Sequence, residues 1–118
     1  ELYLLSPLHD SFQVWYQGFL NDLLTTYPSI DGIEAAEGVV DWNWDWSVDY
    51  NPVANQKYKT AYPTGTLGDA NWKIFRASGL TKLHQILIQV AHAKSKQAYV
   101  VQTWSSKSDG HLITFPFP

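Results

Sequence analysis

The chain has 118 residues, of which 45% are hydrophobic and 16% charged, and its formal net charge is −3. This length allows at most one small domain with a modest core. The eight basic residues form no cluster, which argues against nucleic-acid binding. No run approaches the ~18 apolar residues of a membrane span, which argues against a membrane-spanning helix. Cysteine is absent, which excludes disulfides and thiolate chemistry.

The beginning of the chain predicts a strand, a helix and a second strand. Residues 2–5 form an apolar run typical of a buried parallel strand. Ser6 and Pro7 are a helix-start signal, with Ser6 as the N-cap, and apolar residues spaced three and four apart predict an amphipathic helix over about residues 8–26. Its apolar stripe comprises Phe12, Trp15, Tyr16, Phe19, Leu20, Leu23 and Leu24, and we expect Trp15 in the core. The next strand is expected at residues 30–36.

A long connection follows the second strand. Residues from about 37 to 68 combine turn residues, aromatics and acids, with a short helix as an option at about 53–61. A connection of this length is often functional in a compact domain. A third strand is expected at residues 98–104, after a second long helix.

The second long helix has a clear start signal. Asp69 is its expected N-cap, Trp72 lies on its buried stripe, and the helix is expected to end near Lys94. Gly79 in its middle costs about 1 kcal/mol relative to Ala, which indicates a kink or close helix packing.

This order of elements makes two consecutive β-α-β units, which implies parallel strands joined by right-handed crossovers. We therefore predict an α/β fold, a parallel β-α-β-α-β segment over residues 1–118, either as a single domain or as a fragment. A TIM (β/α)8 barrel needs about 250 residues, so the favoured interpretation is the central portion of such a barrel. The alternative is a small three-layer domain whose outer strands come from elsewhere. The lack of methionine and the abrupt apolar start lead us to expect a piece of a longer chain or a processed product.

Carboxylates and tryptophans gather where the second strand is expected to end. Glu34 and Glu37 lie at that end, and Trp42, Trp44 and Trp46 follow at alternate positions. Carboxylates handle protons or a developing oxocarbenium charge, while flat rings stack on the apolar faces of sugars. Because functional sites in parallel sheets gather at the C-terminal ends of strands, the pattern predicts a site that binds or cleaves carbohydrate.

Three segments resemble a known family. The sequence YPSIDGIE at residues 27–34 resembles the Y-x-(V/I)-D-G-I entry into the fourth strand of glycoside-hydrolase-type barrels. LSP at residues 5–7 is similar to the N-P step before it, and WKIFR at residues 72–76 resembles the W-R-R-x-N-V segment of the family-10-like glycosyl hydrolases. The chain departs from the family pattern where Ala36 replaces an Asp and Glu34 replaces a His, and it has no N-E dipeptide at the strand end. The resemblance implies a TIM barrel that acts on carbohydrate.

The predicted site has an enzymatic and a non-catalytic interpretation. In a glycoside hydrolase, Glu34 or Glu37 would be the general acid/base, with the second carboxylate of the pair lying on a missing strand. Glu34 would be partly desolvated if its strand face points into the barrel, which suits proton donation. Substrate-binding roles are expected for His9, Trp42, Trp44, Asp45, Gln102 and Trp104. In a non-catalytic glycan-binding or structural segment, these acids would only accept hydrogen bonds or pair with Lys or Arg, and the tryptophan row would be a buried strand.

Other chemistry is disfavoured. Asp41, Asp45 and Asp49 recur every four residues, a spacing that can bind Ca²⁺, but the EF-hand pattern is absent. His84 and His92 are too far apart on one helix to share an ion, and we expect them to be surface or packing residues. No metal or cofactor is expected. The expected partners are a carbohydrate ligand and the remainder of the barrel, and the glycan interpretation slightly favours an extracellular or periplasmic, bacterial protein.

Overall fold

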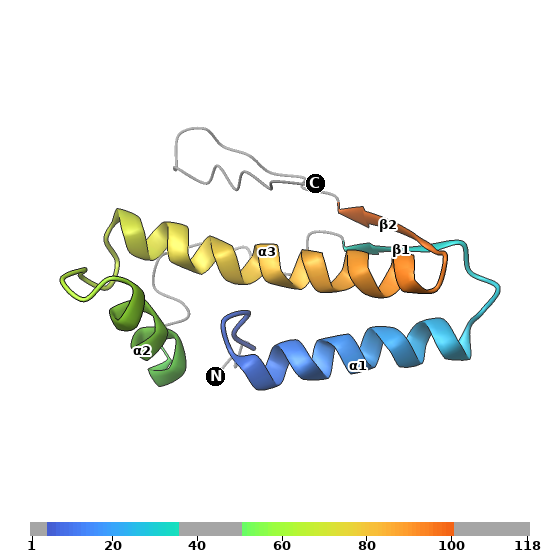
Figure 1. Cartoon of the computed structure of the whole chain (residues 1–118), viewed down its shortest axis with the longest axis horizontal. Helices are drawn as coiled ribbons and strands as arrows, with labels where there is room; N and C mark the ends of the chain where they lie inside the picture. Colours follow the sequence, from blue (N-terminus) through green and yellow to red (C-terminus); the bar gives the residue numbers. More distant parts are fainter. Residues whose placement is uncertain (1–4, 36–50, 101–118) are drawn as a thin grey trace.

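The computed structural model describes residues 5–35 and 51–100. Its elements, in chain order, are α1 (Asp10–Thr26), β1 (Gly32–Ala35), α2 (Pro52–Ala61), α3 (Ala70–Ala93) and β2 (Gln97–Val100), shown in Figure 1. Residues 2–4 of the first predicted strand and residues 101–104 of the third lie outside the described ranges. The observed helices α1, α2 and α3 confirm the two long helices predicted from the sequence and the optional short helix.

The two described strands pair in parallel, as the β-α-β pattern predicted. Gly32 lies opposite Gln97 and Glu34 opposite Tyr99 in the register. The chain leaves the C-terminal end of β1 and returns through α2 and α3 to the start of β2. In Figure 1, α1 and α3 run side by side in the same direction and both strands run the opposite way. The described residues therefore form a mixed α/β unit in which a helical crossover joins two parallel strands.

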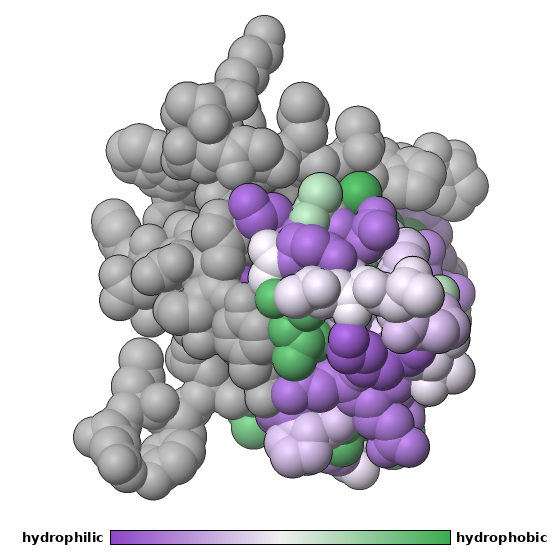
Figure 2. All heavy atoms as spheres, turned by 90° about the vertical axis from the view of Figure 1, so that its left-hand side faces the viewer, coloured by the Kyte–Doolittle hydropathy of each residue, from purple (hydrophilic) through white to green (hydrophobic). Residues whose placement is uncertain are grey.

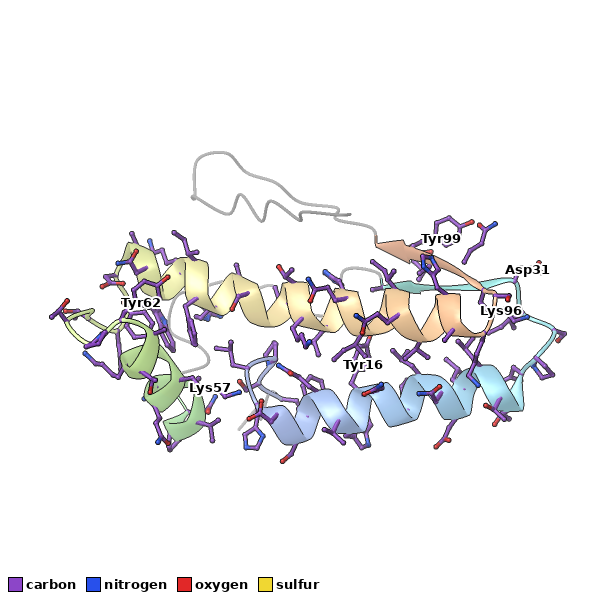
Figure 3. All side chains as sticks on the ribbon, viewed as in Figure 1. Tyr16, Asp31, Lys57, Tyr62, Lys96 and Tyr99 are labelled. Atoms are coloured by element: carbon purple, nitrogen blue, oxygen red, sulfur yellow. The ribbon has the colours of Figure 1, made fainter. Side chains whose placement is uncertain are left out.

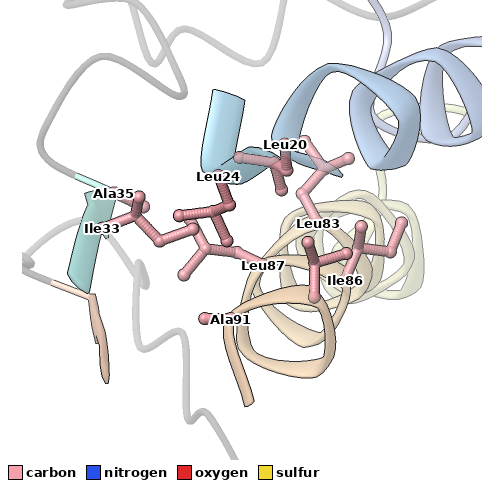
Figure 4. Close-up of a cluster of buried hydrophobic side chains, with 9 residues drawn as sticks. Leu20, Leu24, Ile33, Ala35, Leu83, Ile86, Leu87 and Ala91 are labelled. Atoms are coloured by element: carbon pink, nitrogen blue, oxygen red, sulfur yellow. The ribbon is translucent and has the colours of Figure 1, made fainter. Parts of the chain in front are cut away.

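The main core lies between the two long helices and one face of the sheet. Ile33 and Ala35 of β1 are buried, whereas Glu34 between them is exposed. Figure 4 shows Leu24 of α1 and Leu87 of α3 meeting these strand residues. The remaining buried members of this cluster are Leu20, Leu83, Ile86, Val90 and Ala91. Strand alternation thus directs every second residue of β1 into the helix layer and the others away from it.

The start of α1 differs from the prediction. The helix begins at Asp10, with His9 as its N-cap: the His9 Nδ1 accepts the backbone N–H of Ser11 at 3.2 Å. The predicted N-cap Ser6 stabilises a preceding turn instead, because its carbonyl accepts the N–H of His9 at 3.1 Å and its Oγ accepts the N–H of Leu8 at 3.3 Å. This turn directs Leu8 into a second cluster of buried side chains.

The prediction that Trp15 lies in the core is wrong. Trp15 is 55% exposed and Phe19 is 47% exposed. The Trp15 ring stacks on Phe12 at a centroid distance of 5.7 Å and on Phe19 at 5.5 Å, so the three rings form a row along α1. Trp15 and the buried Leu24 are about 2.5 helical turns apart and therefore lie on opposite sides of the helix. The apolar arc of α1 is wider than the surface that the described elements cover.

The second cluster attaches α2 to the beginning of α3. Its fully or almost fully buried members are Leu8, Ala54, Tyr58 and Trp72, so the prediction that Trp72 is a core residue is confirmed. The rings of Tyr58 and Trp72 meet edge to face at 5.1 Å. Because these rings point inward, the described surface at the α2 end of the molecule is mainly hydrophilic (Figure 2).

Two further predictions about α3 are confirmed. Asp69 is its N-cap, and its Oδ1 accepts the backbone N–H of Trp72 at 2.7 Å. Gly79 permits close packing: a Cβ there would lie 3.0 Å from the Leu8 Cδ2 and 3.1 Å from the Pro7 Cβ. His84 is a buried packing residue, and desolvation lowers the pKa of its imidazole.

None of the helices within residues 5–35 and 51–100 is long and apolar enough to cross a membrane.

Candidate functional site

The face of the sheet that points away from α1 and α3 carries the candidate site. We call it the open sheet face and define it by Gly32, Glu34, Gln97 and Tyr99. The side chains of Glu34, Gln97 and Tyr99 are all exposed, and that of Tyr99 is 52% exposed. Figure 3 shows Tyr99 directed away from the helix layer. A carboxylate, an amide and a phenol therefore share one surface.

The register places these groups next to one another. Glu34 and Tyr99 are direct partners on neighbouring strands, and so are Gly32 and Gln97. Neighbouring strands lie about 4.8 Å apart, and residues two apart on a strand are separated by about 6.6 Å. The carboxylate of Glu34 and the ring of Tyr99 can therefore contact the same small ligand.

Two local contacts shape the open sheet face. The hydroxyl of Tyr99 donates a hydrogen bond to the side-chain oxygen of Gln97, which holds the phenol along β2. At Gly32, a Cβ would approach the backbone oxygen of Gln97 to 2.7 Å, so glycine is required for the close approach of the two strands. The surface beside Gln97 consequently stays free of a side chain from β1.

His9 is the second predicted site residue that the structure describes. It lies at the start of α1, at the end of the fold toward which β1 and β2 point (Figure 1). Lys57 of α2 fixes this corner, since its Nζ donates to the Leu8 carbonyl at 2.8 Å and to the Asp10 Oδ1 at 2.6 Å. The hydrogen bond from Lys57 holds the pKa of the Asp10 carboxyl below its ordinary value. The Nδ1 of His9 is engaged in capping, which leaves its Nε2 side for any ligand.

The other predicted site residues lie outside the described residues. They are Glu37, Trp42, Trp44, Asp45, Gln102 and Trp104, together with Asp41 and Asp49 of the alternative Ca²⁺ site. Among residues 5–35 and 51–100, no three His, Asp or Glu side chains come together in a way that could hold a metal ion.

Glu34 is the one carboxylate that the described strands place on the open sheet face. Its exposure differs from the partly desolvated position expected for it. Of the other described acids, Asp10 pairs with Lys57, Asp69 caps α3, Asp22 lies on α1 and Asp31 precedes β1. None of these four lies beside Glu34 on the open sheet face, so a second carboxylate at the C-terminal end of the sheet would come from outside the described ranges.

Sequence reasoning did not identify Gln97 and Tyr99. It concentrated on the expected end of the third strand, at Gln102 and Trp104. A signal was present, because Gln97, Ala98 and Tyr99 alternate between polar and apolar, a pattern typical of a strand covered on one face.

Comparisons of the chain with protein-family models, with curated proteins and with solved structures find no match.

Proposed function

We propose that the chain forms part of a TIM (β/α)8 barrel of the glycoside-hydrolase type and acts on a poly- or oligosaccharide by carboxylate general acid/base chemistry. The observation that carries this proposal is the polar and aromatic open sheet face, with Glu34 and Tyr99 as direct neighbours.

The chemistry of the two sheet faces favours a barrel over a three-layer domain. Parallel sheets are normally covered on both faces. A three-layer domain would need apolar side chains on both faces of β1, but only Ile33 and Ala35 meet this need, on the helix side. Covering this face completely with a second helix layer would desolvate the polar side chains of Glu34 and Gln97 at a cost of about 1–3 kcal/mol each. The inward face of a barrel is also packed with side chains, but its strands open at their C-terminal ends onto the substrate site, and Glu34 lies near that end of β1.

The aromatic row on α1 supports a continuation of the barrel beyond this helix. In a β/α barrel every outer helix has a neighbour on both sides. The described helix that packs along α1 is α3, and the hydrogen bond from the Lys94 Nζ to the Thr25 Oγ1, 3.0 Å long, marks the side where they meet. Trp15 and Phe19 are exposed on another flank of α1, where a further β/α unit would bury them. The proposed partner of this flank is the remainder of the barrel.

Glu34 is the proposed general acid/base, and a positioned side chain of this kind contributes about 10²–10⁴-fold to a rate. In this proposal Glu37 shares or supplies that role, Trp42, Trp44 and Trp104 are sugar platforms, and His9, Asp45 and Gln102 bind hydroxyls. The chemistry requires no cofactor. A glycan substrate fits an extracellular or periplasmic location.

A second candidate function is non-catalytic glycan binding. It is favoured by the single carboxylate on the open sheet face within the described residues, since hydrolysis by this chemistry uses a pair. In this alternative, Glu34 accepts hydrogen bonds from sugar hydroxyls and transfers no proton.

One set of assays tests both candidates. Binding and the release of reducing ends are measured with cellohexaose, xylohexaose and chitohexaose for the wild type, Glu34→Gln and Glu37→Gln. Asp22→Asn, an exposed acid on α1, is the matched control for charge removal. Loss of turnover of about 100-fold or more with binding retained supports the hydrolase. Binding without turnover in the wild type supports the glycan-binding module, and the absence of binding to all three sugars contradicts both.

A further inference from the structure

The aromatic row on α1 continues into an acidic residue. Phe12, Trp15, Phe19 and Asp22 follow one another at spacings of three, four and three, so they lie along one stripe of the helix. Trp15 and Phe19 are about half exposed, and Asp22 is exposed as well. Alternating steps of three and four are typical of a stripe along which two helices pack side by side. We call these four residues the α1 seam.

We propose that the α1 seam binds an amphipathic helix that runs in the same direction as α1 and carries a basic side chain beside Asp22. This inference rests on the proposed function, because the helix is the outer helix of the preceding β/α unit of the barrel. It adds the chemistry and the direction of that neighbour. Three observations carry it: the exposed rings of the seam, the acidic charge in its C-terminal half, and the packing of α3 on the other flank of α1.

The contact with α3 shows how a neighbouring helix meets α1. The two helices run side by side in the same direction (Figure 1). At their C-terminal ends, the Lys94 Nζ donates to the Thr25 Oγ1 at 3.0 Å. Because α1 has no basic residue in its last turn, this lysine brings the positive charge that stabilises a helix C-terminus. A helix on the seam flank would bring the same charge to Asp22.

The charge of Asp22 selects a basic neighbour over a purely apolar one. Asp22 lies one turn before the end of α1, where the partial negative charge of the helix C-terminus adds to that of the carboxylate. Apolar side chains alone would bury the carboxylate without a partner, which is costly. A Lys or Arg on the neighbouring helix would compensate both charges, while apolar residues one and two turns earlier on that helix would cover Phe19 and Trp15.

A second copy of the chain does not match the seam. α1 contains Asp10 and Asp22 but no Lys or Arg, so two facing seams would bring only acids together. The exposed parts of Trp15 and Phe19 amount to about 200 Å², since an aromatic side chain can bury about 150–250 Å². A stable interface needs about 800 Å² per partner. The seam therefore fits a helix that the rest of a longer chain holds in place, at a lower entropic cost of association.

The test fuses a designed helix to the N-terminus of the full chain through a flexible Gly-Ser linker. About twenty linker residues give a mean reach of about 25 Å, which matches the length of α1. One fusion carries a helix of leucine and lysine with the leucines at helical spacing, and its matched control has glutamate in place of every lysine. The linker gives the helix a roughly millimolar effective concentration, so a weak contact can be measured. The readouts are the Tm and the hydroxyl-radical labelling of Trp15 and Phe19.

The lysine fusion is expected to lower the labelling of Trp15 at least about twofold relative to the unfused chain and to raise the Tm by about 4 °C. The glutamate fusion should do neither. Trp15→Ala should abolish the rise in Tm, whereas Ile74→Ala, at an exposed apolar residue of α3, should keep it. Asp22→Lys should transfer the protection to the glutamate fusion. Asp31→Lys makes the same change in net charge outside the seam and should leave the preference for lysine.

Equal protection by both fusions, or an Asp22→Lys variant that still prefers the lysine helix, overturns this inference. A wild type that sediments as a dimer and becomes monomeric on Trp15→Ala also overturns it, because a second copy then occupies the seam. The sugar assays are independent of these results. Sugar binding without docking of either helix leaves the proposed function in place and contradicts this inference. Docking of the lysine helix without sugar binding supports this inference and contradicts both glycan functions.

Discussion

The hydroxyl of Tyr58 donates a 2.6 Å hydrogen bond to the Oδ1 of Asp69, the residue that caps α3. The same carboxylate accepts the backbone N–H of Trp72 through Oδ1 at 2.7 Å and that of Thr66 through Oδ2 at 2.9 Å. One side chain thus joins α2, the loop that follows it and the first turn of α3. This joint holds α2 against the start of α3, within the connection that leads from β1 to β2.

Replacing Tyr58 by Phe removes the hydroxyl and keeps the ring packing against Trp72. We expect Tyr58→Phe to lower the Tm by about 4–8 °C, because a buried hydrogen bond to a carboxylate is lost. Tyr27→Phe, at an exposed tyrosine, should leave the Tm unchanged. Thermal unfolding followed by circular dichroism makes the measurement, and equal Tm values for the two variants would contradict the expected role of Tyr58.

The same hydrogen bond makes stability sensitive to alkali. Desolvation, followed by the hydrogen bond to Asp69, raises the pKa of Tyr58 to about 12. Since an unfolded tyrosine ionises near pH ~10, the contribution of Tyr58 is present below that pH and is lost as the pH rises toward 12. Urea unfolding between these pH values should therefore show a steeper loss of stability in the wild type than in Tyr58→Phe.

The loss of stability at acid pH depends on Asp69. The hydrogen bond from Tyr58, followed by those from the N–H groups of Trp72 and Thr66, lowers the pKa of the Asp69 carboxyl below its ordinary value. The unfolded chain therefore takes up this proton at a higher pH than the folded chain does. The stabilisation is complete above pH ~4 and is lost as the pH falls through the lowered folded value.

Asp69→Asn tests this linkage, because asparagine is also a good N-cap but does not titrate. At neutral pH the wild type is expected to be more stable than the variant, and the difference should shrink steadily as the pH falls below ~4. Urea midpoints of both proteins measure it. A difference that stays constant across the acid range would show that the charge of Asp69 contributes nothing to the joint.

Two helical glycines form a matched pair. A Cβ at Gly18 of α1 would meet nothing within 4 Å, whereas one at Gly79 of α3 would lie 3.0 Å from the side chain of Leu8. Gly18→Ala is expected to stabilise the fold by about 1 kcal/mol, the usual helix-propensity gain. Gly79→Ala is expected to lose that gain and destabilise the fold by about 1 kcal/mol, because the buried Leu8 must shift. Urea unfolding of both variants measures the change in the free energy of unfolding. Equal stabilisation by Gly18→Ala and Gly79→Ala would mean that the packing of α3 against Leu8 is loose.

Ser95, just after the C-terminal end of α3, has a backbone conformation that glycine adopts more easily. Ser95 has a φ of 55°, and the N–H groups of Ser95 and Lys96 bond to the carbonyls of His92 and Ala91, as in a Schellman motif. A left-handed conformation costs a non-glycine residue about 1 kcal/mol. Ser95→Gly should therefore raise the free energy of unfolding by about that amount. Ser78→Gly, inside α3, should lower it by roughly 0.5 kcal/mol, and the same sign for both variants would contradict the assigned backbone.

Helical periodicity was enough to predict the long helices of this mixed α/β unit, but it could not decide which face of each helix is buried. The spacing of apolar residues located α1 and α3, and Asp69 marked the start of α3 correctly. The start of α1 was misplaced because Ser6 is an equally good turn residue: its bonds to Leu8 and His9 form a turn, and the helix begins only after it, with His9 as the cap. Within the candidate site, Glu34 remains a prediction from the sequence, whereas the position of Tyr99 beside it follows from strand register, which a single sequence does not determine.

Trp15 and Trp72 also show that periodicity does not decide which apolar side chains are buried, because each lies on an apolar helix stripe yet only Trp72 is fully buried. Trp72→Ala is expected to cost about 3–5 kcal/mol, since the cavity would lie between Leu8 and Tyr58 in a closed cluster. Trp15→Ala is expected to cost at most about 1 kcal/mol, because only ring stacking on Phe12 and Phe19 is lost. Urea unfolding followed by far-ultraviolet circular dichroism compares them, with Trp72→Phe in reserve if the alanine variant does not fold. A loss this small applies to residues 1–118 alone, since a further unit of the proposed barrel would bury this flank of α1 and raise the cost of Trp15→Ala.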